Sequence, residues 1–269
     1  MLKFNIAKTI LMCAAMAWPS LCYAGAWNLP PGEGQVISTF NYSQADKAYS
    51  DIEGLDSAVE FTKSELRVFY EHGLTKHVTV VVNAAHQTIG FQGPQSAINF
   101  SDFDKTELGL RYELKRSEGL AVSVQGSYIL GGGPPESILD IGSRKDSFEL
   151  RGLWGQSKEY ETYVIFFDAQ AAIRARNTDR IEDWRTDLTL GWKDKKKLMA
   201  LVQGYYTQRA SFGREDSFFV PVQKRAKVQA SIVYEFKKNR LVQFGYLQTL
   251  GGRNIVKERT VTLGTWVRY

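Results

Sequence analysis

The sequence predicts an all-β protein, a single-chain antiparallel transmembrane β-barrel of twelve strands, with a count of ten to fourteen left open. Three features predict this fold: an export signal at the amino terminus, alternation of apolar and polar residues along the remaining chain, and a last strand with an aromatic end. Leu263, Thr265, Val267 and Tyr269 share one face of that strand. They are typical of the closing strand that the barrel-assembly machinery of Gram-negative bacteria recognises, although a half-buried strand of a soluble β-domain has the same period.

Residues 1–24 are predicted to be a cleaved secretory signal peptide. Two lysines precede an apolar segment, and Cys22-Tyr23-Ala24 supplies the small-x-small pattern of a cleavage site before Gly25. Cut there, the mature chain loses both of its cysteines and forms no disulfide. We therefore expect an exported protein of the bacterial outer membrane, with a periplasmic leader at 25–33 and a transmembrane barrel at 34–269.

The charge of the mature chain is nearly balanced. The whole chain has 34 Lys and Arg against 29 Asp and Glu, and removal of Lys3 and Lys8 with the signal peptide leaves 32 against 29, a net charge of +3. That excess is too small to indicate a nucleic-acid partner. No later segment has the roughly 18 consecutive apolar residues of a membrane helix. His72, His77 and His86 lack a metal-binding spacing, so we expect no metal or other cofactor.

Alternating segments recur along the whole mature chain, as a transmembrane barrel requires. The predicted strands are 34–48, 58–72, 76–90, 101–115, 119–131, 145–157, 160–175, 181–193, 197–211, 222–237, 240–251 and 258–269. Short turns alternate with longer connections, and an even strand count places both termini in the periplasm. The longer, outer connections are predicted near 49–57, 91–100, 132–144, 212–221 and 252–257.

Alternation also assigns each side chain to a face. In the tenth strand, for example, Ile232 would meet lipid while Arg225 and Lys227 would point inward. A soluble β-sandwich reverses this assignment, and the period alone does not separate the two folds. Aromatic residues near strand ends favour the barrel, because such residues form girdles at membrane interfaces. These aromatic residues are Tyr70, Tyr112, Trp154, Trp192 and Trp266.

The inward-facing residues carry charges of both signs, which favours a porin-like channel. Such a lumen would attract and orient small polar or sugar-like solutes. The alternative is a network of internal ion pairs that fills a narrow barrel and leaves no pore. The leader contains two prolines that cannot join a sheet, and it would either hang in the periplasm or tuck into the barrel mouth. The candidate lumen charges are Arg67, Arg111, Arg151, Asp168, Arg174, Arg185, Asp187 and Arg225.

No catalytic residue is assigned, and we do not expect an enzyme. One alternative remains, a lipid hydrolase, because His86 is predicted on the lipid face near the outer end of its strand. Ser64 or Ser101 on a neighbouring strand would then be the nucleophile, activated by the histidine as general base.

Three segments of the mature chain together resemble the XagA-like, exopolysaccharide-associated barrels of proteobacterial outer membranes. They are residues 25–37, residues 65–79, and Gly245-Tyr246 with 251–254 and Trp266-Val267-Arg268-Tyr269. The resemblance implies an outer-membrane barrel near surface polysaccharide. It adds the alternative of a filled barrel that acts as a structural or adhesive surface protein. The partners it implies are outer-membrane lipid and lipopolysaccharide, with a small polar solute or a polysaccharide as the ligand.

Overall fold

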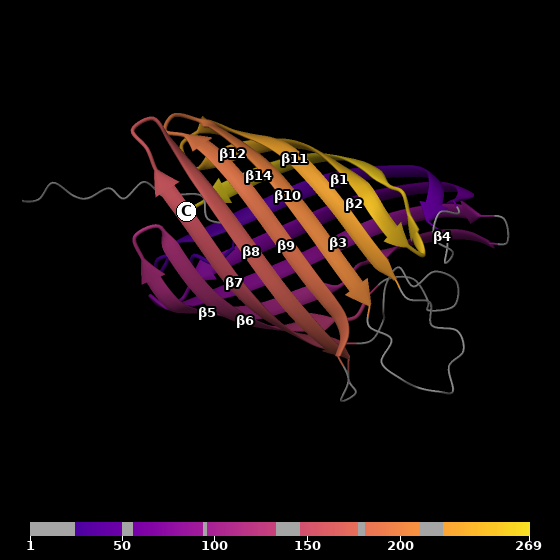
Figure 1. Ribbon diagram of the computed structural model, residues 1–269, viewed down its shortest axis with the longest axis horizontal. Helices are drawn as coiled ribbons and strands as arrows, with labels where there is room; N and C mark the ends of the chain where they lie inside the picture. The colour runs from indigo at the N-terminus through magenta and orange to yellow at the C-terminus, as the bar shows by residue number, and fades with distance from the viewer. Residues whose placement is uncertain (1–24, 50–55, 94–95, 133–145, 177–180, 210–222) are drawn as a thin grey trace, which may run out of the picture.

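The computed structural model describes residues 25–49, 56–93, 96–132, 146–176, 181–209 and 223–269. In these residues the chain forms a single antiparallel sheet that closes into a barrel (Figure 1). The all-β barrel predicted from the sequence is therefore confirmed. The signal peptide predicted at 1–24 lies outside the described residues. No helix within the described ranges is long and apolar enough to cross a membrane.

The described strands follow one another around the barrel wall almost in chain order. They are β1 (Gly34–Tyr49), β2 (Asp56–Gly73), β3 (Val78–Gly93), β4 (Ser96–Phe103), β5 (Thr106–Ser117), β6 (Leu120–Leu130), β7 (Ser147–Glu159), β8 (Tyr163–Arg176), β9 (Ile181–Asp194), β10 (Leu198–Arg209), β11 (Lys224–Lys237), β12 (Arg240–Arg253), β13 (Ile255–Val256) and β14 (Arg259–Arg268). β4 and β5 both pair with β3, and β13 and β14 both pair with β1. Each of these two pairs makes one strand of the wall, which gives the twelve strands predicted.

The first and last strands close the barrel. β1 pairs with β14 from Gln35 opposite Arg268 to Gln44 opposite Arg259. Tyr269 completes this seam, because its backbone N–H donates to the Gly34 oxygen at 3.0 Å and the Gly34 N–H donates to the Tyr269 oxygen at 2.9 Å. We call the end of the barrel that holds this seam contact and the short turns the turn end, and the opposite end the loop end.

Two of the predicted outer connections are strand in the structure. The connection expected near 91–100 is shortened, because β3 continues to Gly93 and β4 begins at Ser96. The one expected near 252–257 reduces to a turn at Asn254, whose positive φ of 55° reverses the chain before β13 pairs with β1. The first three strands and β4 project beyond the rest of the wall at the loop end (Figure 1). A buried apolar cluster accounts for this extension, since it gives the longer strands an inner face to pack: Ala45, Val59, Phe61, Ile89 and Phe91.

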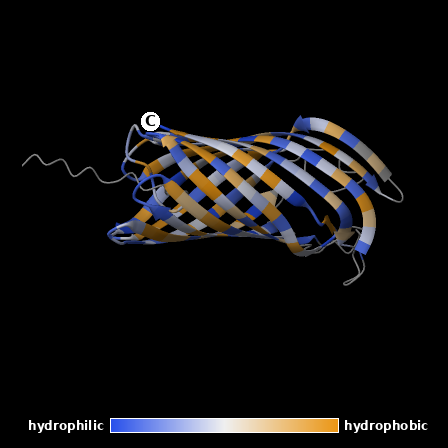
Figure 2. Cartoon of the chain, turned by 90° about the horizontal axis from the view of Figure 1, so that it is seen from above, coloured by the Kyte–Doolittle hydropathy of each residue, from blue (hydrophilic) through white to orange (hydrophobic). Residues whose placement is uncertain are grey.

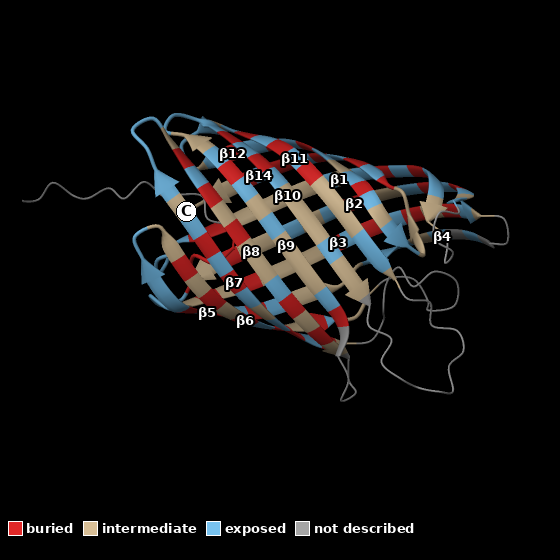
Figure 3. Ribbon diagram, viewed as in Figure 1, coloured by how far each residue is buried: buried red, intermediate tan, exposed pale blue. Residues whose placement is uncertain are grey.

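The outer face of the wall is apolar and exposed. Figure 2 shows apolar and polar residues alternating along each strand, and Figure 3 shows the matching alternation of exposed and buried positions. Leu110, Leu190 and Ile232, all assigned to lipid by alternation, are more than half exposed. An apolar belt of this extent would aggregate in water and is stable against lipid hydrocarbon. Tyr112, Trp154, Trp192 and other exposed large apolar residues belong to it.

Candidate functional site

The eight charges predicted to line the lumen all come from inward-facing positions of the wall. Register places Arg225 there, because Thr207 lies opposite both Arg185 on β9 and Arg225 on β11. Residues that pair directly across neighbouring strands share a face of the sheet, and Arg185 reaches inward to Glu149. Arg225 therefore also points into the lumen.

Glu149 is the centre of the largest charged network. Its side chain is fully buried, and Arg151 donates to its Oε1 at 2.6 Å from Nη2. Arg174 donates to Oε2 at 2.8 Å, and Arg185 lies 3.4 Å from the same oxygen. Arg151 also pairs with Asp187 at 2.9 Å. Burying one carboxylate among three guanidinium groups satisfies the carboxylate, so this network stiffens the β7–β9 wall.

A second charged network lies across the lumen on β2 and β3. Arg67 donates to Glu65 at 3.0 Å and to Asn83 at 3.1 Å, and it lies 3.6 Å from Asp104. Lys63 pairs with the same Glu65 at 3.3 Å. Opposite charges thus line both walls of the loop-end half.

The eight predicted charges differ sharply in access to solvent. The side chains of Arg67, Arg185 and Asp187 are 31%, 29% and 23% exposed, and Arg225 is exposed as well. Arg111, Asp168 and Arg174 are 3%, 1% and 5% exposed. These three do not face a solute, contrary to the expectation from the sequence, because other side chains and the leader enclose them. Arg111, for instance, is paired with Glu71 at 2.8 Å.

The leader crosses the lumen at the turn end, which is the second of the two positions left open by the sequence. The backbone N–H of Ala26 donates to Asp168 at 2.8 Å, and that of Asn28 to Glu113 at 3.2 Å. Leu29 N–H reaches the Thr79 hydroxyl at 3.3 Å. Two wall residues donate back to leader carbonyls: Arg116 to Asn28 at 2.7 Å and Ser123 to Ala26. Residues of β3, β5, β6 and β8 thus hold the leader across the bore.

Trp27 fills a notch in the lumen wall. Its ring is buried in a cluster with Ala26, Ala121 and Leu153. A Cβ added at Gly155 would overlap the ring, so the wall has room for the indole only because residue 155 has no side chain. Sequence reasoning missed Trp27 as a functional residue, because an isolated tryptophan ahead of the first strand gives no periodic signal.

An apolar cluster inside the lumen lines the other side of the turn end. Trp266 is part of it and donates from its indole nitrogen to Gln243 at 3.0 Å. This corrects the placement of Trp266 in an interfacial girdle. Its even-numbered position in the last strand, opposite in phase to Leu263 and Val267, was the signal for an inward side chain. The rest of the cluster is Phe166, Met199, Leu201, Val233 and Leu241.

The arrangement required for a hydrolase is not formed at His86. The histidine is on the lipid face, as predicted, but its ring packs edge-on against Phe103 with centroids 5.4 Å apart. The Ser101 hydroxyl is bonded to Thr88 at 3.0 Å instead of to a general base. Ser64, the other candidate nucleophile, also lies opposite Thr88 in the register.

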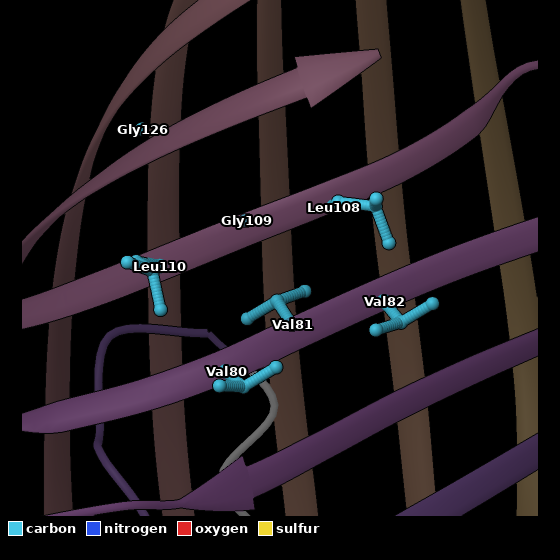
Figure 4. Close-up of a pocket in the computed structure, with 7 residues that line it drawn as sticks. All are labelled: Val80, Val81, Val82, Leu108, Gly109, Leu110 and Gly126. Carbon is cyan, nitrogen blue, oxygen red and sulfur yellow. The ribbon is translucent and has the colours of Figure 1, made fainter. Parts of the chain in front are cut away.

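A shallow depression lies on the outside of the wall over β3, β5 and β6 (Figure 4). It is lined by Val80, Val82, Leu108, Leu110 and Gly126. Gly126 leaves it open, since an added Cβ there would have no neighbour within 4 Å. The lining is apolar and faces lipid, so the depression suits hydrocarbon and not a polar solute.

Asp146 fastens the base of the connection between β6 and β7 at the loop end. The backbone N–H of Gly131 donates to its carboxylate at 2.9 Å, and the Tyr128 hydroxyl donates to the other oxygen. These hydrogen bonds favour the ionised carboxylate and lower the pKa of Asp146. The prediction of a long outer connection at 132–144 falls almost wholly outside the described residues.

Comparisons with known proteins agree on the fold. No family model matches the chain, and no curated protein matches it. Among solved structures, the COG4313 outer membrane channel from Pseudomonas putida F1 is 12% identical, with a TM-score of 0.68 over 92% of this chain and 99% of that one. The beta domain of the Bordetella autotransporter BrkA (12% identity, TM-score 0.52, 88% and 100% covered) and the translocator domain of autotransporter NalP from Neisseria meningitidis (10%, 0.50, 91% and 91%) are similar too. The chain therefore has the fold of an outer-membrane β-barrel.

Proposed function

We propose that the protein is a channel of the bacterial outer membrane that passes small polar or sugar-like solutes and is closed at rest by its own leader. The contrast between the two halves of the lumen carries this proposal. At the loop end, Arg185, Asp187 and Arg225 are open to water. At the turn end, Trp27 and the apolar cluster around Trp266 are buried against the wall. A charged vestibule that leads to a removable obstruction is the layout of a gated pore.

The leader is removable because it is not a strand of the wall. Hydrogen bonds at Ala26, Asn28 and Leu29, together with the buried ring of Trp27, hold the leader in the lumen. Each such bond contributes about 0.5–1.5 kcal/mol net. Next to β1, backbone hydrogen bonds join Gly32 and Glu33 to Gly73 and would keep the leader attached to the wall. It can leave the lumen without opening any strand pair, whereas releasing β14 from β1 would break a ladder from Gln35 to Gln44.

The vestibule favours an anionic or hydroxyl-rich solute. Arg225 is exposed and its side chain forms no hydrogen bond or ion pair with the described residues, and the side chain of Arg185 is 29% exposed. A guanidinium group with unused donors matches the oxygens of a carboxylate or an acidic sugar. Asp187 nearby would orient hydroxyl groups and repel a simple dianion. One of the similar barrels, the COG4313 protein, is itself an outer membrane channel, which supports the proposal.

The position of the barrel in the membrane is inferred from its apolar outer face. We infer that its apolar belt lies in outer-membrane lipid, with lipopolysaccharide around the loop end, and that the turn end is periplasmic. We also infer that the barrel-assembly machinery recognises the final strand through Leu263, Thr265, Val267 and Tyr269. Val261 and Leu263 are exposed on the lipid face, as that role requires.

A second candidate function is a filled barrel that acts at the cell surface. The buried network around Glu149 favours it, since a wall stiffened by ion pairs needs no open bore. The resemblance to XagA-like barrels would then mean a structural or adhesive role with exopolysaccharide. In that case deletion of the outer loops would abolish cell attachment and leave permeability unchanged.

Single-channel recording separates the two candidates. The mature chain and a variant without residues 25–31 are refolded and inserted into planar lipid bilayers. Folding of each is checked by its resistance to unfolding in detergent when the sample is not heated. We expect rare or small conductance steps from the mature chain and larger, persistent steps from the variant. If the variant is folded and silent, the channel proposal fails and the surface role gains support.

A further inference from the structure

Asp168 is a buried carboxylate against which the leader begins. It lies on β8 with 1% of its surface exposed. Gln170 donates to its Oδ1 at 2.7 Å, and the Ala26 N–H donates to its Oδ2 at 2.8 Å. Gly25 also lies against it, because a Cβ at that position would overlap the carboxylate. Gly25 also has a φ of +121°, so glycine is the residue that this approach requires.

The charge of Asp168 has no cationic side chain to balance it. Arg111 and Arg151 act on it only at longer range. Each is committed to another carboxylate: Arg111 to Glu71 at 2.8 Å, and Arg151 to Glu149 at 2.6 Å. Among the described residues, no Lys, Arg or His forms an ion pair with Asp168. A carboxylate removed from water is costly unless a cation or a full set of donors compensates it.

We propose that Asp168 is a binding site for an ammonium group, and that its ligand is the α-amine of Gly25 in the processed chain. Signal peptidase would hydrolyse the Ala24–Gly25 bond with one water, which leaves a carboxyl on Ala24 and an amine on Gly25. An α-amine has a pKa of about 7.7–8.0 and is largely protonated at neutral pH. The amine forms at the residue that already lies against the carboxylate, one position from the Ala26 N–H bond.

Processing and closure are thereby linked. Before cleavage the nitrogen of Gly25 is an uncharged amide and supplies no positive charge to balance Asp168. After cleavage it supplies the missing positive charge and fixes the end of the leader to β8. The hydrogen-bond chain from Asp168 through Gln170 to Arg151, at 2.7 Å for each step, joins this contact to the charged vestibule. The inference rests on the proposed role of the leader as an obstruction, but it is tested without measuring transport.

The test measures the reactivity of the α-amine. Mature protein starting at Gly25 is refolded in lipid vesicles and treated near pH 7 with an amine-acylating reagent, and mass spectrometry follows the N-terminal peptide. We expect acylation of the wild-type amine to be at least tenfold slower than in Asp168→Asn, which keeps the shape and removes the charge. Asp104→Asn, a carboxylate of the other network, is the control and should behave like wild type.

A second variant guards against misfolding of Asp168→Asn. A chain that retains Ala24 moves the amine one residue away from Asp168 with the wall unchanged, and we expect it to react as fast as Asp168→Asn. Equal rates in the wild type, Asp168→Asn and the extended chain, whether fast or slow, would overturn the proposal. A barrel that never conducts could still show slow acylation of the Gly25 amine. Failure of the channel proposal is therefore distinguishable from failure of the ammonium-site proposal.

Discussion

The indole of Trp27 lies where the side chain of residue 155 would be if that residue were not glycine. The wall and the leader are therefore complementary in shape at this point. Substitution of Gly155→Val should force the ring out of its notch, because the added methyl groups would occupy the same space. We expect the variant to recover at least half of the conductance gained by deleting residues 25–31, measured in single-channel recordings.

Gly152 provides a matched control for this substitution. It lies on the same strand but faces lipid, and an added Cβ there would have no neighbour within 4 Å. Gly152→Val should leave conductance at the wild-type level. If both valine variants raise the conductance equally, the effect comes from a general disturbance of β7 and not from displacement of the Trp27 ring at Gly155.

Loss of the charge at Glu149 should destabilise the barrel strongly. Glu149→Gln leaves Arg151, Arg174 and Arg185 without their shared carboxylate, and removing one partner of a buried ion pair costs about 3–5 kcal/mol. Urea unfolding of the protein in lipid vesicles would measure the free energy. Glu159→Gln is the comparison, since its pair with Lys195 is about half exposed and is worth about 0–1 kcal/mol. Equal losses in the two variants would contradict the central role of Glu149.

Charge on the outer face should be tolerated according to depth. Leu110→Arg places a cation in the apolar belt and should cost about 2–4 kcal/mol of unfolding free energy in vesicles. Leu114→Arg lies beyond Tyr112, closer to the turn end of β5, and should cost about 0–1 kcal/mol. If this face were in contact with water instead of lipid, an arginine would cost little at either position. Similar small costs for both variants would therefore argue against a membrane position for this face.

Neutralising the open arginines of the vestibule should change ion selectivity. Arg185→Gln combined with Arg225→Gln removes two positive charges from the solvent-accessible part of the lumen. The reversal potential in a salt gradient should therefore shift in the direction of greater cation selectivity. The measurement is best made in the chain without residues 25–31, where current is largest. Arg259→Gln removes an exposed charge from the outer face and should leave the reversal potential unchanged.

Alternation predicted the wall of this protein well because the side chain of each strand residue points either to the outer face or into the lumen. Ile232 meets lipid and Arg185 faces the lumen, as the period of two requires. The same period could not predict which inward charges reach water. Arg174 and Arg225 have the same chemistry and the same assignment, yet one is enclosed by its contact with Glu149 and the other is open. That difference depends on what lies across the lumen, which a single strand does not encode.

The sequence could not decide between the two positions of the leader for a related reason. Ala26 meets Asp168 across 142 positions of sequence, and Asn28 meets Glu113 across 85. No local pattern specifies contacts of such separation. The strand ends at Gly93 and Arg253 were misjudged because glycine and polar residues favour turns locally, whereas pairing with a neighbouring strand kept them in the sheet.

The separation of the leader from its contacts also determines when it can fold. Its partners Thr79, Glu113, Ser123 and Asp168 belong to four strands that come into position only as the sheet curls and β14 meets β1. Loop closure over such distances is slow compared with hairpin formation. The residues that precede every strand in the chain are therefore the last to reach their native surroundings. Until then the notch at Gly155 and the carboxylate of Asp168 have no leader against them.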